Sequence, residues 1–203
     1  SIFPPEGGNL NMLPKAIGEK RVWEQWIGIA PFAAHKGKIY PIEKMQEVIS
    51  LLCQRHPKAR IFLFGRGKDE DEVFPNWEQL MPQCTNVGWH LETMHQELIL
   101  MSHVDVMLSM DSANMHLASL TGTPVVSVWG ATDPLAGFLG WGQSLDNAVR
   151  LTLDCRPCSI FGKKSCRYGD YRCLENAGMS GDKDMRRYAV TFVDNHDTFK
   201  DLP

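Results

Sequence analysis

The residues best suited to chemistry are Asp111-Ser112-Ala113-Asn114, which directly follow an apolar run at 104–110. Asp, Ser and Asn act as caps at the start of a helix, but capping explains one of them and not all three. The backbone N–H groups of 112–114 would form a positive helix end that suits a phosphate. Asp111 could instead accept hydrogen bonds from sugar hydroxyl groups. His116, one turn later, is either part of this site or a buried core histidine.

A second candidate group is the loop 31–41, which includes Ala34 and three basic residues. The loop joins an apolar strand to a helix that is predicted to begin at Pro41. Lys38 lies just before this helix, where its ammonium group and backbone N–H groups could hold an anion together. The alternative is a solvated loop whose charged side chains bind nothing.

Two further strand ends carry small or polar residues, Gly65-Arg66-Gly67 and Thr132-Asp133. Glycines let a ligand approach the backbone, although turns also use glycine for steric reasons alone, and Thr132-Asp133-Pro134 is a good turn former by itself. Because ligands of parallel α/β folds lie beyond the carboxyl ends of the strands, the four groups predict a nucleotide-type pocket. The chain has no Walker-type phosphate loop, no G-x-G-x-x-G and no G-x-S-x-G, which disfavours NTPases, dehydrogenases and serine hydrolases.

The six cysteines divide into two groups. Cys53 and Cys84 stand alone and are interpreted as buried, small hydrophobic residues. The other four lie within nineteen residues, which in a cytoplasmic protein favours metal or redox chemistry over structural disulfides. Their C-x2-C-x7-C-x6-C pattern supplies enough ligands for a structural zinc ion, with disulfides or free thiols as the alternatives. These four are Cys155, Cys158, Cys166 and Cys173.

The elements that must position these groups alternate along the chain. Apolar runs predict strands at 26–31, 59–64, 85–88, 104–110, 124–129 and 148–153. Helical spacing predicts helices at 41–56, from 69 onward with interruptions at Pro75 and Pro82, at 92–102 and at 111–120. Such alternation indicates a parallel sheet that is covered on both faces. We therefore expect an α/β fold, a doubly wound parallel sheet in a single Rossmann-like domain, over residues 24–155.

Composition and charge narrow the class of protein. The 203 residues are 43% hydrophobic and 22% charged, which is typical of a globular chain. The net charge of −3, with no basic stripe, argues against a nucleic-acid partner. No apolar run approaches the ~20 residues of a transmembrane segment. Residues 1–8 lack the features of a signal peptide, so a soluble, cytoplasmic protein is expected.

The order of these motifs resembles glycosyltransferase family 9, the ADP-heptose–lipopolysaccharide heptosyltransferases of Gram-negative bacteria. The resemblance covers about residues 24–177 and rests on three motifs: Pro31 to Pro41, Asp111-Ser112-x-x-x-His116-Leu117-Ala118 and Gly130-Ala131-Thr132-Asp133-Pro134. The loop 155–177 resembles a cysteine-bearing tail of many members. The family has two Rossmann-like domains in the GT-B arrangement, and this chain matches the C-terminal, donor-binding half. Residues 1–23 would then be an interdomain linker or remnant.

The resemblance implies inverting transfer, in which an acceptor hydroxyl attacks the anomeric carbon while ADP departs. Lys38 would neutralise the donor phosphates, the amides of 112–114 would cradle them, and Asp111 would bind the heptose or place the leaving diphosphate. The family's general base lies in the N-terminal domain, which would also hold the lipopolysaccharide core acceptor, at the inner face of the inner membrane. We therefore expect ADP-heptose binding, little or no transfer by this chain alone and no required cofactor. The expected catalytic residues are Lys38 and Asp111, and the expected substrate-binding residues are Ala34, Lys38, Gly65, Gly67, Asp111, Ser112, Ala113, Asn114, His116, Thr132 and Asp133.

Three alternatives stay open at this point. The domain could bind another nucleotide sugar, such as a UDP-sugar, or could be a metal-stabilised interaction module. The third concerns the tail 178–203, in which Arg187 to Thr198 resembles a segment of the α-amylases, glycoside hydrolase family 13, with His196 and Asp197 at sugar-contacting positions. This match covers a small part of a barrel of about 250 residues, and nothing else in the chain supplies the second carboxylate of a glycosidase. The tail is therefore expected to be catalytically inert.

Overall fold

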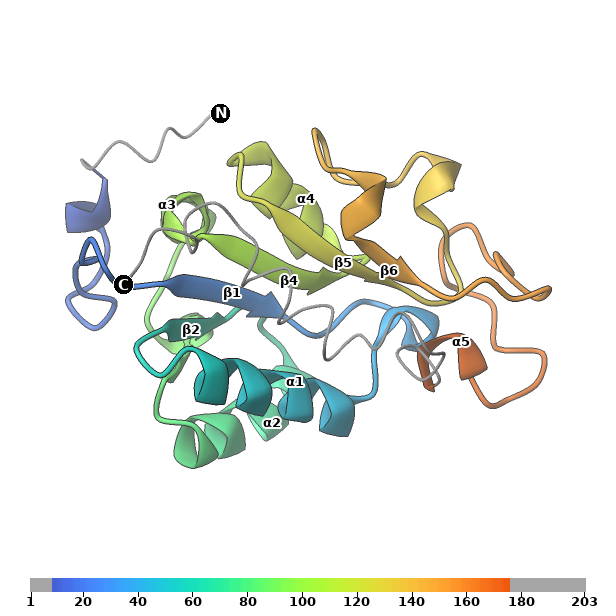
Figure 1. Ribbon diagram of the computed structural model, residues 1–203, viewed down its shortest axis with the longest axis horizontal. Helices are drawn as coiled ribbons and strands as arrows, with labels where there is room; N and C mark the ends of the chain where they lie inside the picture. Colours follow the sequence, from blue (N-terminus) through green and yellow to red (C-terminus); the bar gives the residue numbers. More distant parts are fainter. Residues whose placement is uncertain (1–8, 176–203) are drawn as a thin grey trace.

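The computed structural model describes residues 9–175, so the amylase-like tail at 178–203 lies outside the described residues. Within this range, six strands form one sheet in which all neighbouring strands run parallel, in the order β3-β2-β1-β4-β5-β6 (Figure 1). This is the strand order of doubly wound, Rossmann-like folds, and it confirms the predicted fold class. The strands are β1 (Trp26–Ala30), β2 (Arg60–Leu63), β3 (Cys84–Asn86), β4 (Val106–Met110), β5 (Val125–Trp129) and β6 (Ala148–Arg150).

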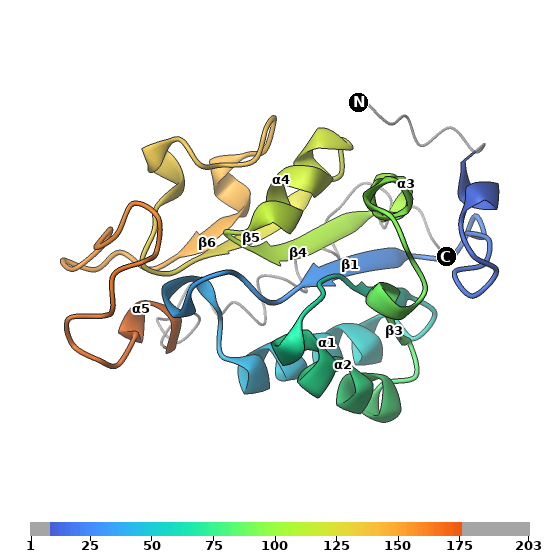
Figure 2. The ribbon, with the colours of Figure 1, turned by 180° about the vertical axis from the view of Figure 1, so that it is seen from behind.

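Helices cover both faces of the sheet, with α1 and α2 on one face and α3 and α4 on the other (Figures 1 and 2). The helices are α1 (Ile42–Arg55), α2 (Lys68–Leu80), α3 (Met94–His103) and α4 (Ala113–Leu120), followed by a short α5 (Arg172–Glu175). The single-turn 3₁₀ helices are η1 (Leu10–Met12), η2 (Lys36–Lys38), η3 (Val87–Trp89), η4 (Pro134–Ala136) and η5 (Leu145–Asn147).

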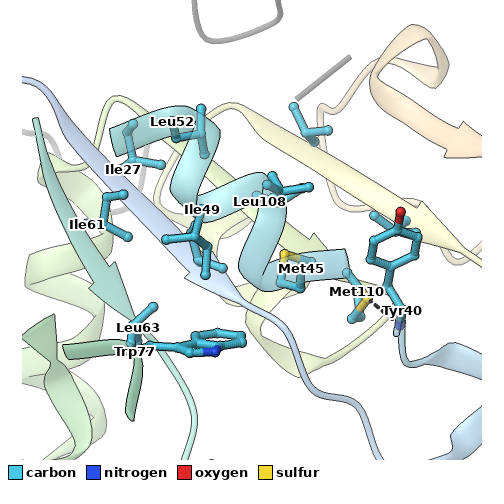
Figure 3. Packing of buried hydrophobic residues seen from close by; sticks show 14 of the residues in the cluster. Ile27, Tyr40, Met45, Ile49, Leu52, Ile61, Leu63, Trp77, Leu108 and Met110 are labelled. Atoms are coloured by element: carbon cyan, nitrogen blue, oxygen red, sulfur yellow. Dashed lines mark hydrogen bonds between the residues drawn. The ribbon is translucent and has the colours of Figure 1, made fainter. Parts of the chain in front are cut away.

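The two layers form because successive side chains of each strand point to opposite faces. On β1, Ile27 and Ile29 pack toward α1 and α2, while Trp26 and Ala30 pack toward α3 and α4. Figure 3 shows the first of these clusters, with α1 laid across the strands. Its labelled residues are Ile27, Tyr40, Met45, Ile49, Leu52, Ile61, Leu63, Trp77, Leu108 and Met110.

One helix differs from its prediction, because α2 runs without a break through Pro75. A proline inside a helix costs about 3 kcal/mol. Phe74 and Trp77 bury their rings on either side of it, and burying such a side chain contributes about 1.5–3 kcal/mol. The acidic residues of the first turn also suit the positive end of the helix dipole. Burial therefore outweighs the local preference of proline.

The segment before β1 packs onto the domain where the structure describes it. Leu13 and Ile17 are buried in the cluster on the side of α3 and α4. Lys20 Nζ lies 2.6 Å from Asp105 Oδ1, and Arg60 donates to the carbonyl of Ile17. Whether residues 1–23 connect this domain to another stays a prediction.

Candidate functional site

Three of the predicted groups meet at the carboxyl edge of the sheet, because β1, β4 and β5 are neighbours there. Lys38, in the loop after β1, places Nζ 2.8 Å from Oδ2 of Asp111, which follows β4. Thr132, in the loop after β5, donates its hydroxyl to the same Asp111 oxygen at 2.7 Å. Asp111 is 5% exposed and Thr132 is fully buried. The edge therefore holds a buried carboxylate with one ammonium and one hydroxyl donor.

Helix α4 begins directly beside this cluster, with Ser112 as its N-cap residue. The Ser112 hydroxyl lies 3.2 Å from that of Ser109 and makes no capping bond to the helix start. Ala113 and His116 are exposed and Asn114 is half-buried. His116 is therefore not a core histidine. An uncapped helix start at the protein surface suits an anion, because its N–H groups have no partner within the helix.

The strand end after β2 lies at the same edge, because β2 pairs with β1. Gly65 and Gly67 have φ angles of 141° and 155°, which side chains rarely adopt. A Cβ atom at either glycine would lie within 2.9 Å of a Glu70 carboxylate oxygen. Arg66 is held by Glu97 and by the carbonyl of Leu91. The Glu70 side chain therefore covers the backbone of these two glycines, whereas Ala34 is exposed on the neighbouring loop.

The observed contacts of Asp133 are those of a turn residue. Its carboxylate accepts from the backbone N–H of Leu135 at 3.0 Å, at the start of η4. It also pairs with Arg150 at 2.9 Å. These bonds fix the shape of the loop after β5, which carries Thr132.

Two further residues act on the cluster that the sequence analysis did not single out. Arg156, between two of the cysteines, donates to the carbonyls of Gly130 and Thr132. Gly162 lies against the stem of Lys38, and a Cβ atom there would be 2.7 Å from Lys38 Cε. Both residues occupy unspecified positions of the cysteine pattern, so only the fold reveals their contacts with the cluster.

The four clustered cysteines line one small cavity together with Arg156, and their thiols are free. Across residues 9–175, however, no group of three or more His, Cys, Asp or Glu side chains could hold a metal ion. The predicted zinc site of Cys155, Cys158, Cys166 and Cys173 is therefore not supported. The thiols have different neighbours, because Cys158 Sγ lies 3.9 Å from the Ala131 carbonyl oxygen, Cys166 Sγ lies 3.9 Å from Asp170 Oδ1, and Cys173 is buried in the hydrophobic cluster under α1 and α2.

Cys53 and Cys84 stand apart in the sequence and lie together in the structure. Cys84 is buried, as predicted, and Cys53 is half-buried. A hydrogen bond joins the two thiols, which lowers the pKa of Cys53 and raises that of Cys84. The pair links the last turn of α1 to the first residue of β3.

We expect iodoacetamide to alkylate Cys166 at least about tenfold faster than Cys173 at pH 8, because the thiolate is the reactive form. Desolvation raises the pKa of Cys166, but backbone N–H groups of 168–171 outweigh it and lower that pKa. Burial raises the pKa of Cys173 to about 11, although Arg156 opposes this. Timed alkylation with peptide mass spectrometry measures both rates, and equal rates would contradict the assignment.

A separate hollow of about 670 Å³ lies at the opposite, amino edge of the sheet. It is lined by eleven residues between Leu10 and Glu24 together with His103 and Asp105, and none of the predicted site residues lines it. Over residues 9–175, no helix has the length and apolar character that crossing a membrane requires.

Comparison with known families gives one match. The chain matches the model of glycosyltransferase family 9 (heptosyltransferase) over residues 13–171. No curated protein matches the chain in sequence.

Solved structures with this fold include ADP-heptose lipopolysaccharide heptosyltransferase II of E. coli, with a TM-score of 0.55 and 20% identity over 68% of this chain and 42% of that one. The E. coli heptosyltransferase WaaC with ADP-2-deoxy-2-fluoro heptose gives a TM-score of 0.58 and 16% identity over 88% of this chain and 45% of that one. The iron-containing dodecameric glycosyltransferase TibC of E. coli gives a TM-score of 0.52 and 13% identity over 86% of this chain and 47% of that one. This chain thus spans less than half the length of each protein, and at these identities the likeness shows the fold.

Proposed function

The chain belongs to glycosyltransferase family 9, the heptosyltransferases, and on this premise we propose that it is the nucleotide-sugar-binding half of such an enzyme. The proposed donor is ADP-heptose. The proposed acceptor is the lipopolysaccharide core, bound by a domain outside this chain at the cytoplasmic face of the inner membrane. The observation that carries the proposal is the cluster of Lys38, Asp111 and Thr132 beside the uncapped start of α4. A WaaC structure that contains ADP supports the choice of nucleotide.

The diphosphate of the donor is proposed to lie between Lys38 and the first turn of α4. An ammonium group has three N–H donors, so Lys38 can keep its bond to Asp111 and still bind a phosphate oxygen. The helix start adds backbone N–H groups and the positive end of a dipole. Asp111 would orient the ammonium through Oδ2 and accept from a sugar hydroxyl.

In the proposed transfer, an acceptor hydroxyl oxygen forms a bond to the anomeric carbon, and the bond from that carbon to the phosphate oxygen breaks. The electron pair leaves with ADP, whose added negative charge Lys38 and α4 stabilise. The proton of the hydroxyl passes to a general base, which we place in the acceptor domain. We therefore expect this chain alone to bind the donor with little or no transfer.

The test is calorimetric titration of the chain with ADP, ADP-heptose and UDP. ADP and ADP-heptose are expected to bind, and UDP to bind at least about tenfold more weakly, a difference of about 1.4 kcal/mol. Asp111→Asn is expected to weaken ADP binding about tenfold, because Lys38 loses its anchor. Asp146→Asn, in η5 near the amino edge, makes the same change of charge and serves as the control.

The outcomes separate the candidates. Selective ADP binding that is weakened by Asp111→Asn supports the proposal. Equal or tighter binding of UDP favours the alternative of a UDP-sugar donor. Binding of no nucleotide at all contradicts a donor site in this domain.

A further inference from the structure

Arg156 is a buried cation whose donors point at backbone carbonyls, two of which lie in the loop after β5. Its side chain is 3% exposed, and its guanidinium donates to the carbonyls of Gly130, Leu151 and Thr132, the last at 2.8 Å. An Asp133 carboxylate oxygen lies 3.9 Å from the guanidinium, farther away than the Thr132 carbonyl. Burial lowers the pKa of this guanidinium, and Asp133 opposes that effect. A buried charge that mainly serves backbone carbonyls fixes the positions of those carbonyls.

The loop after β5 is also fixed by hydrogen bonds at both backbone polar groups of Ala131. The N–H of Ala131 donates to the carbonyl of Gly37 at 2.8 Å. The carbonyl of Ala131 accepts from the N–H groups of Cys158 and Ser159 at 3.1 and 3.2 Å. The loop after β5 is therefore fixed between the loop after β1, which carries Lys38, and the cysteine-bearing segment.

This loop places the side chain of Thr132 beside Asp111. Its hydroxyl donates to Asp111 Oδ2 at 2.7 Å, and the same oxygen lies 2.8 Å from Lys38 Nζ. A continuous series of contacts thus runs from Arg156 through Thr132 and Asp111 to Lys38. A shift of the Thr132 backbone would change the position of the carboxylate and, with it, that of the ammonium.

We infer that Arg156 is a positioning residue of the donor site. Through Thr132 and Asp111, it holds the Lys38 ammonium group where that group can bind the donor phosphates. This inference rests on the proposed function. Arginine is required because its planar group aims several N–H donors in fixed directions, whereas one lysine ammonium cannot reach three separate carbonyls with the same geometry. Through Arg156, the cysteine-bearing segment then supports the binding site from outside it.

A double-mutant cycle tests the inference, with ADP affinity measured by calorimetry on this chain. Arg156→Lys keeps the charge and is expected to weaken ADP binding about tenfold. Thr132→Val removes the hydroxyl and is expected to have a similar effect. In the Thr132→Val background, Arg156→Lys should change the affinity less than about twofold, because the series is already interrupted. Arg172→Lys, in the same segment and paired with Asp170, is the control and should leave affinity unchanged.

A purely structural role gives a different result, because the loss from Arg156→Lys would then be the same in both backgrounds. That outcome overturns the inference, as does full affinity in Arg156→Lys. If the arginine variant does not fold, the nearly isosteric variant Thr132→Val provides the test. An unchanged ADP affinity in Thr132→Val overturns the inference, and a tenfold loss of affinity supports it. A wild-type chain that binds no nucleotide overturns the proposed function itself, which the other outcomes leave intact.

Discussion

Lys38→Met is expected to destabilise the domain by about 3 kcal/mol and to weaken ADP binding at least about tenfold. The stability effect arises because Asp111 is 5% exposed, and among residues 9–175 the Thr132 hydroxyl would be left as the partner of its buried carboxylate. Removing one partner of a buried ion pair costs more than the pair itself contributes. The binding effect arises because the phosphates lose their charged donor. Urea unfolding measures the first effect, and calorimetry with ADP measures the second.

A second variant separates the two effects. Lys38→Met combined with Asp111→Asn removes both charges and is expected to recover most of the stability, because no uncompensated charge stays buried. It should not recover ADP binding. Lys36→Met is the matched control, since Lys36 is exposed in the same 3₁₀ turn and lies over the ring of Tyr171. Its stability should change by no more than about 0.5 kcal/mol. Full ADP affinity in Lys38→Met would contradict the assignment of this lysine to the donor site.

Gly130→Ala is expected to destabilise the domain by about 3 kcal/mol or more, which corresponds to a fall of about 6–12 °C in Tm for a chain of this size. A Cβ atom at this position would lie 2.4 Å from the carbonyl oxygen of Gly37 and 2.6 Å from Leu174 Cγ. The backbone cannot easily move away, because the next residue, Ala131, is bonded to Gly37. Differential scanning calorimetry of the variant beside the wild type checks the result.

Gly137→Ala is the control for this substitution. Gly137 ends η4 with a φ angle of 88°, and an added Cβ atom would contact nothing within 4 Å. Its cost is therefore conformational alone, about 1 kcal/mol. If the two alanine variants lose equal stability, the close approach between the loops after β1 and β5 is not a constraint on the fold.

The sheet could be predicted because its strands are short, apolar and separated by helical segments. Val125–Trp129 is buried along its whole length, as a strand in the middle of a doubly wound sheet must be. The last strand was harder to predict. It ends at Arg150 and not at Leu153, and the carbonyl of Leu151 is bonded to Arg156. No local pattern signals that contact, because it depends on where the following segment folds back.

The positions of the candidate site residues could be predicted from the sequence, but their mutual contacts could not. The sequence places Lys38, Asp111 and Thr132 after three strands, and parallel pairing then brings them to one edge. Their common contact at a single carboxylate oxygen depends on loop packing, which spacing does not encode. The cysteine pattern likewise gives a number of ligands but not their directions. Cys158 and Cys166 contact different oxygen atoms and Cys173 packs among apolar side chains, and the pattern forms no metal site in the described residues.

The packing of Leu13 and Ile17 determines how far the chain can be truncated before β1. Both side chains are buried in the cluster that covers one face of the sheet, although they precede β1 by several residues. A shorter chain starting at Trp26 would contain every strand and every described residue of the site. It would nevertheless leave an apolar surface open to water where these two side chains pack, and such surfaces promote aggregation. For expression, recombination or fusion, the unit to be kept whole therefore starts ahead of Leu13.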